Sequence, residues 1–176
     1  MKKKIFILII LYYLIISSFI FPQDYSTVLG FSGIYREDSW TPLIIRIKND
    51  KQSISGRLVV EIDNSGTAII QNRQYIKPVE LPSGSSKEFS FIIPIGNHSK
   101  DIKYYLVREN GTFVFEDSIE LKQRGIKKNF ILGVSPYPDL GFLNNHSKLD
   151  ERPIIYPHID NLPVNSYGYD AVDIVS

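Results

Sequence analysis

The feature that most constrains the fold is the regular spacing of turn signals between short alternating segments, from Ser26 to about Gln123. In Ile45–Lys48 the isoleucines and the cations alternate, as they do on a half-buried strand. Gly56–Asp63 repeats this pattern, and Leu81–Ser86 has the composition of a turn. We therefore predict about seven or eight strands in about 100 residues, which is typical of an immunoglobulin-like antiparallel β-sandwich.

Three details refine this prediction. Asn110-Gly111 separates two strand-like runs and indicates a tight hairpin. Pro94 lacks an N–H and indicates an edge strand or a strand end. Trp40 and several phenylalanines are expected as large core side chains. The predicted strands are Thr27–Tyr35, Leu43–Lys48, Gly56–Asp63, Thr67–Leu81 (one long strand or two short ones), Lys87–Pro94, Ile102–Arg108 and Thr112–Leu121.

The pattern changes after the predicted sandwich domain, residues 24–123. Residues 124–128 are a short basic stretch that we interpret as a linker. Residues 129–176 begin with a nearly continuous apolar run that ends at Ser135, and continuous apolarity suits a strand covered on both faces in a parallel sheet. We expect a helix from Asp139 to Asn145, with Asp139 as N-cap, and strands at Ile154–Tyr156 and Tyr169–Val175.

This second part is too short to cover both faces of a parallel sheet, and the sequence stops within a predicted apolar strand. We therefore expect an incomplete α/β segment that is truncated or continues in a longer protein. The alternative is an irregular appendage to the sandwich.

The N-terminus predicts export. Lys2, Lys3 and Lys4 precede an uncharged run, Ile5–Phe21, which is at the short limit for a spanning helix. Residues 1–23 are thus a signal peptide or a retained membrane anchor, and both remain open because Ser17-Ser18 is followed by bulky residues. We expect the rest of the chain in the periplasm or on the outer face of the cytoplasmic membrane. The sequence contains no cysteine, which excludes disulfides and a lipid-modified cysteine.

Charge bears on the kind of partner. The whole chain has a net charge of +1, and loss of Lys2, Lys3 and Lys4 gives +1 − 3 = −2. A nearly neutral surface argues against nucleic acid, whose binding needs clustered positive charge. The expected partners are envelope proteins or the remainder of a longer chain, and the membrane if Ile5–Phe21 is retained.

Several short motifs occur along the chain. They are Gly30-x-x-Gly33-x-Tyr35, Trp40-x-Pro42-Leu43 leading to Asn49, Leu81-Pro82-x-Gly84-Ser85-x-Lys87, Leu162-Pro163 and Gly168-Tyr169-Asp170-Ala171-Val172-Asp173. Together they resemble a group of large bacterial cell-envelope proteins. The resemblance implies an immunoglobulin-like sandwich followed by an α/β domain similar to class I glutamine amidotransferases. It does not carry over the amidotransferase activity, because the family's nucleophile is a cysteine later in the α/β domain.

No residue is predicted as catalytic, cofactor-binding or metal-binding. Ser135 ends a predicted parallel strand, where open α/β sheets place ligands, but it lacks the second glycine of a nucleophile elbow, so we interpret it as a turn residue. The histidines lack metal-ligand spacing, the C-terminal acids suit caps and turns, and the tyrosines suit core and rim positions. These residues are His98, His146, His158; Asp139, Asp150, Glu151, Asp160, Asp170, Asp173; and Tyr104, Tyr105, Tyr137, Tyr156, Tyr167, Tyr169.

The sequence therefore predicts a non-catalytic exported envelope protein whose sandwich is an interaction or structural module. The alternative is a fragment of a larger envelope enzyme or ligand sensor, with its pocket in the incomplete amidotransferase-like segment.

Overall fold

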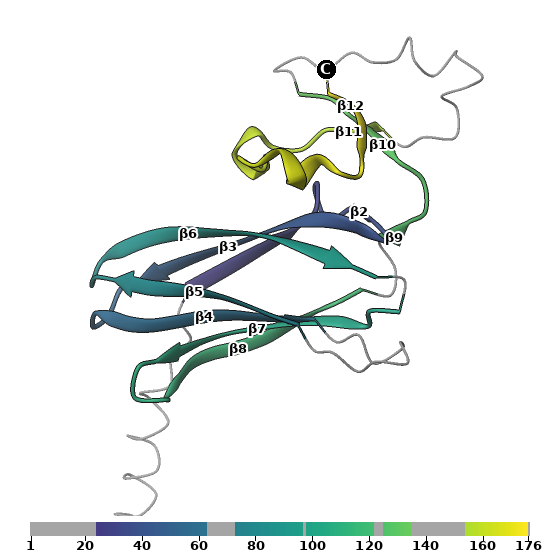
Figure 1. Cartoon of the computed structure of the whole chain (residues 1–176). Coiled ribbons are helices and arrows are strands. Elements are labelled where there is room, and N and C mark those ends of the chain that lie inside the picture. Colours follow the sequence, from purple (N-terminus) through teal and green to yellow (C-terminus); the bar gives the residue numbers. More distant parts are fainter. Residues whose placement is uncertain (1–23, 63–72, 97, 122–124, 135–153, 176) are drawn as a thin grey trace, which may run out of the picture.

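Two antiparallel sheets pack face to face, and a small parallel sheet lies over one of them (Figure 1). The structure is a computed structural model that describes residues 24–62, 73–96, 98–121, 125–134 and 154–175. Within these residues, no helix has the length and apolarity that a membrane crossing needs. The predicted N-terminal signal or anchor lies outside them, as does the helix predicted from Asp139.

The sandwich is built from a three-stranded and a four-stranded sheet. Chain neighbours such as β3 and β4 lie in different sheets, as in an immunoglobulin-like sandwich, which confirms the predicted fold class. The first sheet has the order β1-β3-β6, with β1 (Asp24–Leu29), β3 (Ser39–Asn49) and β6 (Ser85–Ile95). The second has the order β5-β4-β7-β8, with β5 (Arg73–Leu81), β4 (Ile54–Ile62), β7 (Asp101–Arg108) and β8 (Phe113–Glu120).

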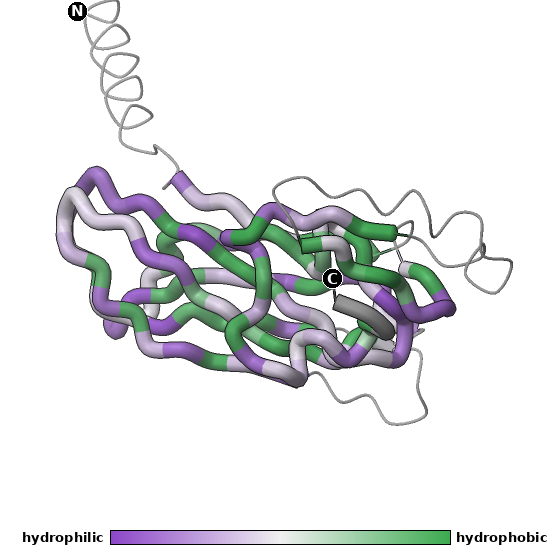
Figure 2. The backbone as a smooth tube through the Cα atoms, turned by 90° about the horizontal axis from the view of Figure 1, so that it is seen from above, coloured by the Kyte–Doolittle hydropathy of each residue, from purple (hydrophilic) through white to green (hydrophobic). Residues whose placement is uncertain are grey.

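The core lies between the two sheets. In β4, Leu58, Val60 and Ile62 are fully buried, as the alternation predicts. Figure 2 shows hydrophobic and hydrophilic residues alternating along the backbone of the sandwich strands. At about 25 cal/mol per Å² of apolar surface removed from water, this burial is the main force that holds the sheets together.

The predicted first strand is divided in two by a tight turn. β1 ends at Leu29, and β2 (Tyr35–Arg36) begins only after the turn. Gly30 has a φ of 60°, and a Cβ at this position would lie 2.1 Å from the carbonyl oxygen of Ile34. Only glycine fits that approach, so the chain folds back here and does not continue as one strand.

Two turn predictions are confirmed. Gly111 has a φ of 82° in the tight connection between β7 and β8, where Asn110-Gly111 indicated a hairpin. Pro94 lies one residue before the end of β6, which is an edge strand. The other predicted sandwich strands lie within two residues of observed ones, except that Leu43–Lys48 is part of the longer β3 and residues 67–72 lie outside the described residues.

The prediction that Trp40 fills the sandwich core is wrong. Its exposed fraction is 42%. Leu43, Ile45 and Ile47 of the same strand face the core, so strand alternation places Trp40 on the outer face of the sheet.

Asn49 has a structural role at the end of β3. It is fully buried, and its side-chain amide donates to the carbonyl oxygens of Gln52, Leu81 and Pro82 at 3.0–3.1 Å. Its side-chain oxygen accepts from the amide of Lys51. These contacts join the turn after β3 to the end of β5, and they satisfy a polar group whose burial is otherwise costly.

The C-terminal part forms a small parallel sheet, as the sequence predicts. Its order is β11-β10-β12, with β10 (Phe130–Leu132) pairing in parallel with β11 (Ile154–Ile155) and β12 (Val172–Val175). Two short 3-10 helices, η2 (Ile159–Asn161) and η3 (Ser166–Tyr169), precede β12. The strand predicted from Tyr169 therefore begins only at Val172, because Tyr169 ends η3. Within the expected linker, β9 (Gly125–Ile126) pairs in parallel with β2.

The parallel sheet and the sandwich share a second, smaller core. Phe31, in the turn after β1, packs edge-on against Phe130, with ring centroids 5.4 Å apart, and lies 5.8 Å from Tyr169. Leu132, Ile155 and Ala171 complete the buried cluster. A side chain from the sandwich therefore lies at the centre of the small sheet's core.

Candidate functional site at the open edge of the sandwich

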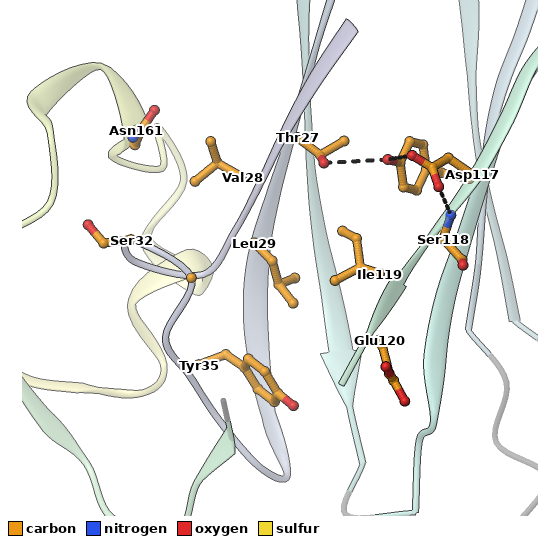
Figure 3. A pocket seen from close by; sticks show the side chains of 12 residues that line it. Thr27, Val28, Leu29, Ser32, Tyr35, Asp117, Ser118, Ile119, Glu120 and Asn161 are labelled. Carbon is orange, nitrogen blue, oxygen red and sulfur yellow. Dashed lines mark hydrogen bonds between the residues drawn. The ribbon is translucent and has the colours of Figure 1, made fainter. Parts of the chain in front are cut away.

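A cavity of about 710 Å³ opens between the edge strands of the two sheets (Figure 3). β1 is an edge strand of the first sheet and β8 is an edge strand of the second. Among the described residues, no hydrogen bond joins the backbones of these two strands. The cavity, here called the edge groove, lies between these two strands. Its lining residues are Thr27, Val28, Leu29, Ser32, Gly33, Tyr35, Tyr104, Asp117, Ser118, Ile119, Glu120 and Asn161.

Strand alternation brings the side chains of the groove together. Thr27 and Leu29 of β1 pair with the core-facing Ile45 and Leu43, so they point between the sheets. On β8, Asp117 pairs with the buried Tyr104 and therefore also points inward. The groove is thus the lateral opening of the sandwich core, with apolar side chains inside and polar groups at its mouth.

Asp117 is the centre of a hydrogen-bond cluster at this opening. Its Oδ2 accepts from the hydroxyl of Tyr104 at 2.9 Å and from that of Tyr25 at 3.1 Å. Its Oδ1 accepts from the backbone amide of Ser118 at 2.7 Å, and the hydroxyl oxygens of Thr27 and Tyr104 are 3.5 Å apart. One carboxylate therefore connects β1, β7 and β8 across the open side.

The electrostatics follow from these contacts. The bond from the Ser118 amide and those from the two tyrosines hold the pKa of Asp117 below its usual value. Burial, together with the bond to Asp117, raises the pKa of Tyr104 to about 12, and the same causes raise the pKa of Tyr25. At neutral pH the carboxylate is ionised and both phenols keep their protons, so the cluster offers fixed charge and hydrogen bonds.

The arrangement favours binding over chemistry. A general acid or base works best with a pKa near the operating pH, and the shifts at Asp117 and Tyr104 move both groups away from neutrality. No group of three or more histidine, aspartate or glutamate side chains within the described part of the chain is arranged to hold a metal ion. What the groove offers is shape, an ionised carboxylate and two strand edges.

Among the described residues, Tyr104 is the one histidine, acid or tyrosine weighed above as a site candidate that lines the groove, together with Gly33 and Tyr35 of the first resemblance motif. His98 is exposed, and His158 is an exposed N-cap of η2 whose Nδ1 accepts from the amide of Asp160 at 3.4 Å. Asp170 contacts Arg36 and the amide of Trp40. Tyr105 bonds Glu61, Tyr169 packs on Phe31, and Tyr156 and Tyr167 are exposed. Ser135, Tyr137, Asp139, His146, Asp150 and Glu151 lie outside the described residues, and for Asp173 only the backbone is described.

Sequence reasoning missed Tyr25, Thr27 and Asp117. A signal for Asp117 exists, because it occupies an inward register position between the apolar Phe115 and Ile119. A carboxylate at a position that otherwise faces the core is unusual, and Asp117 keeps its access to solvent because β8 is an edge strand. Which side chains on β1 are its partners depends on the packing of two sheets and has no local signal.

Comparison with known proteins gives low similarities to solved structures. Bacteroides uniformis β-glucuronidase is 14% identical with a TM-score of 0.41, over 82% of this chain and 24% of that one. A calcium-binding mutant of B. uniformis β-glucuronidase 2 is 12% identical with a TM-score of 0.42, over 65% and 17%. A β-glucosidase from Listeria innocua is 10% identical with a TM-score of 0.36, over 59% and 16%.

The matched region is therefore at most about a quarter of those three chains. No curated protein matches the sequence. A family model described as a domain of unknown function, DUF8726, matches residues 23–122, which include the whole sandwich. The chain therefore belongs to the DUF8726 family.

Proposed function

We propose that this protein is a non-catalytic, exported module of the bacterial cell envelope whose sandwich binds another protein at the edge groove. The observation that carries the proposal is the groove itself, an opening flanked by two strand edges that do not pair with each other. Exposed strand edges pair readily with another chain, and natural proteins protect them or use them for recognition. Export rests on Lys2–Lys4 followed by Ile5–Phe21.

The sandwich also serves as a platform in this proposal. Phe31 enters the core of the parallel sheet, and Arg46 of β3 donates at 2.9 Å to the carbonyl oxygen of Asp160 and to Oδ1 of Asn161. These contacts hold the C-terminal segment against the outer face of the β1-β3-β6 sheet, where Asn161 also contributes to the lining of the edge groove.

Site-specific photo-crosslinking in native cells tests the proposal. A photoreactive phenylalanine analogue replaces Ser118 in the groove, and the control places it at Gln74, an exposed position on β5. We expect one defined adduct with an envelope protein at Ser118 and none at Gln74. Equal adducts at both positions, or none at either, would contradict a binding site in the groove.

Export has its own test. In spheroplasts, added protease should degrade the protein, whereas a cytoplasmic marker protein should stay intact. Protection of both proteins would place this chain inside the cytoplasm and overturn this part of the proposal.

A second candidate function is favoured by the parallel order of β11-β10-β12, since open parallel sheets bind ligands at the carboxyl ends of their strands. In this reading the chain is part of a larger envelope enzyme or ligand sensor, with its pocket in an amidotransferase-like α/β segment. Thermal-shift screening of the full chain against amino acids and amides separates the two candidates. Ligand-dependent stabilisation that is lost on mutation near β10 would support the second.

A further inference from the structure

The backbone of β1 has hydrogen-bonding groups that face the groove. The amide of Gly30 donates to the carbonyl of Pro42 at 2.7 Å and continues the β1–β3 register. Hydrogen-bonded pairs recur at every second residue of an antiparallel ladder, so Val28 bonds β3 and Thr27 turns its N–H and C=O to the open side. Leu29 has the same orientation, and its carbonyl accepts from the amide of Gly33 at 3.1 Å.

The residues that offer an unused edge are therefore Tyr25 and Thr27. Among the described residues, their outward N–H and C=O groups form no hydrogen bond with another backbone group. Both side chains point between the sheets, and both are only partly exposed. A strand laid along β1 would pair with these groups and extend the β1-β3-β6 sheet.

The opposite edge is covered at one position. The amide of Leu121 donates to the carbonyl of Lys100 at 3.0 Å, so the alternation on β8 turns the N–H of Ser118 outward. That N–H is already used, because Oδ1 of Asp117 accepts from it at 2.7 Å. A carboxylate that covers an edge amide hinders strand addition at that residue, so the edge of β1 is the better template.

The groove also has a definite chemical character. Its lining contains two carboxylates, Asp117 and Glu120, and no lysine or arginine. Strand alternation turns Asp117 and the apolar Ile119 between the sheets, where Leu29 also lies, and turns Glu120 to the outer face of β8. The complement of such a groove is an extended segment that carries cations and small apolar side chains.

We propose that the edge of β1 takes up an extended, lysine- or arginine-bearing segment of another protein by strand addition, with its cations toward Asp117. This inference rests on the proposed function, in which the groove binds a protein. Main-chain hydrogen bonds to Tyr25 and Thr27 provide the affinity, and the carboxylate of Asp117 selects the charge of the segment.

Fluorescence anisotropy with purified full-length chain tests it. The probe is a short labelled peptide of alternating lysine and valine, and the control probe replaces each lysine by glutamate. We expect saturable binding of the first probe, weaker binding as salt rises, and no binding of the second. Equal binding of both probes, or of neither, would overturn the proposal.

A matched pair of variants separates backbone pairing from general attraction. Thr27→Pro removes the outward N–H, and an edge strand tolerates proline at such a position. Thr27→Val removes only the hydroxyl. We expect Thr27→Pro to weaken binding about tenfold and Thr27→Val to leave it within about twofold. Equal loss in both variants would contradict strand addition.

A second measurement keeps the test valid if Thr27→Pro does not fold. The same lysine–valine probe, N-methylated at alternate amides, cannot donate hydrogen bonds along one edge. We expect methylation of one alternate set to abolish binding and methylation of the other set to preserve it. Equal binding of both methylated probes would overturn the proposal.

Two further outcomes distinguish this inference from the function on which it rests. An adduct at Ser118 in cells, with no binding of the lysine–valine probe, would leave the groove as a protein site and reject the cationic strand. A concentration-dependent dimer that Thr27→Pro abolishes would also reject it, since the occupant of β1 would then be a second copy of this chain.

Discussion

The sandwich and the parallel sheet bury their apolar side chains in different ways. Among the residues that the structure describes, the sandwich core contains 20 buried residues, and all of them come from residues 29–121. In the same part of the chain the core of the parallel sheet contains five, and one of these, Phe31, belongs to the sandwich. The first region can therefore exclude water from its own core, whereas the second uses the surface of the first.

This difference indicates two levels of stability in one chain. Regions with fewer buried apolar contacts open at lower free energy than the main core. We expect the parallel sheet to open while the sandwich stays folded, and the following predictions test this separation, in order of decreasing effect.

The largest effect is expected in the sandwich core. Leu58 is fully buried on β4, and Leu58→Ala removes apolar contacts and leaves a cavity. We expect the free energy of global unfolding to fall by about 4 kcal/mol, measured by urea denaturation with circular dichroism. The control, Ile76→Ala, truncates a side chain whose exposed fraction is 50%, and should change it by less than about 1 kcal/mol. Equal losses would mean that Leu58 is not in the main core.

The next effect is expected in the shared cluster. Phe31→Ala removes the ring that contacts Phe130 and Tyr169. We expect the opening free energy of the parallel sheet to fall by about 3 kcal/mol, seen as faster hydrogen exchange in β10, with unchanged exchange in β4. Phe113→Ala, at an exposed position on β8, is the control. Loss of protection in β4 as well would mean that the two regions form one cooperative unit.

A smaller effect concerns alkaline pH. The pKa of Tyr104 is raised to about 12 in the folded protein, against about 10 for free tyrosine, so the stability it contributes is complete below pH 10. That contribution is lost as pH rises from about 10 through 12, because the unfolded chain loses this proton first. We expect Tyr104→Phe to reduce the fall in melting temperature over this window, and Tyr156→Phe to leave it unchanged.

Only part of the alkaline loss should disappear in Tyr104→Phe. The pKa of Tyr105 is also raised to about 12, by burial and by its hydrogen bond to Glu61. A melting temperature whose pH dependence is identical in wild type and Tyr104→Phe would show that the groove cluster does not shift this pKa.

The smallest effect is expected at the polar contacts between the two regions. Arg46 forms an ion pair with Glu88 at 2.9 Å and donates to Asn161 on η2. Because these groups are partly exposed, we expect Arg46→Gln to destabilise η2 by only about 0.5–1 kcal/mol. Hydrogen exchange at residues 159–162 measures it, with the exposed Arg73→Gln as control. If Arg46→Gln lowered the opening free energy as much as Phe31→Ala does, charge and not apolar packing would be the main force between the sandwich and the C-terminal segment.

Much of the fold can be predicted from local patterns. Alternation identifies β4 and β6, Asn110-Gly111 identifies the hairpin, and the continuous apolar run identifies β10. These signals are local because side-chain direction and turn conformation depend on a few neighbouring residues.

The remaining features depend on contacts between distant residues. Trp40 lies on the outer face of β3 because Leu43, Ile45 and Ile47 face inward. Its backbone amide donates to Asp170, which is 130 positions away in the sequence. The edge groove likewise joins Thr27 to Asp117 through the packing of two sheets. No local pattern determines which edge strands lie opposite each other.

Native-state hydrogen exchange of the full chain under increasing urea tests the central claim most directly. We expect amides of β10 to exchange through a local opening at lower free energy than amides of β3, β4 and β7, which exchange only on global unfolding. One common free energy for both sets, with the same dependence on urea, would contradict the claim that the sandwich is the independent unit and the parallel sheet depends on it.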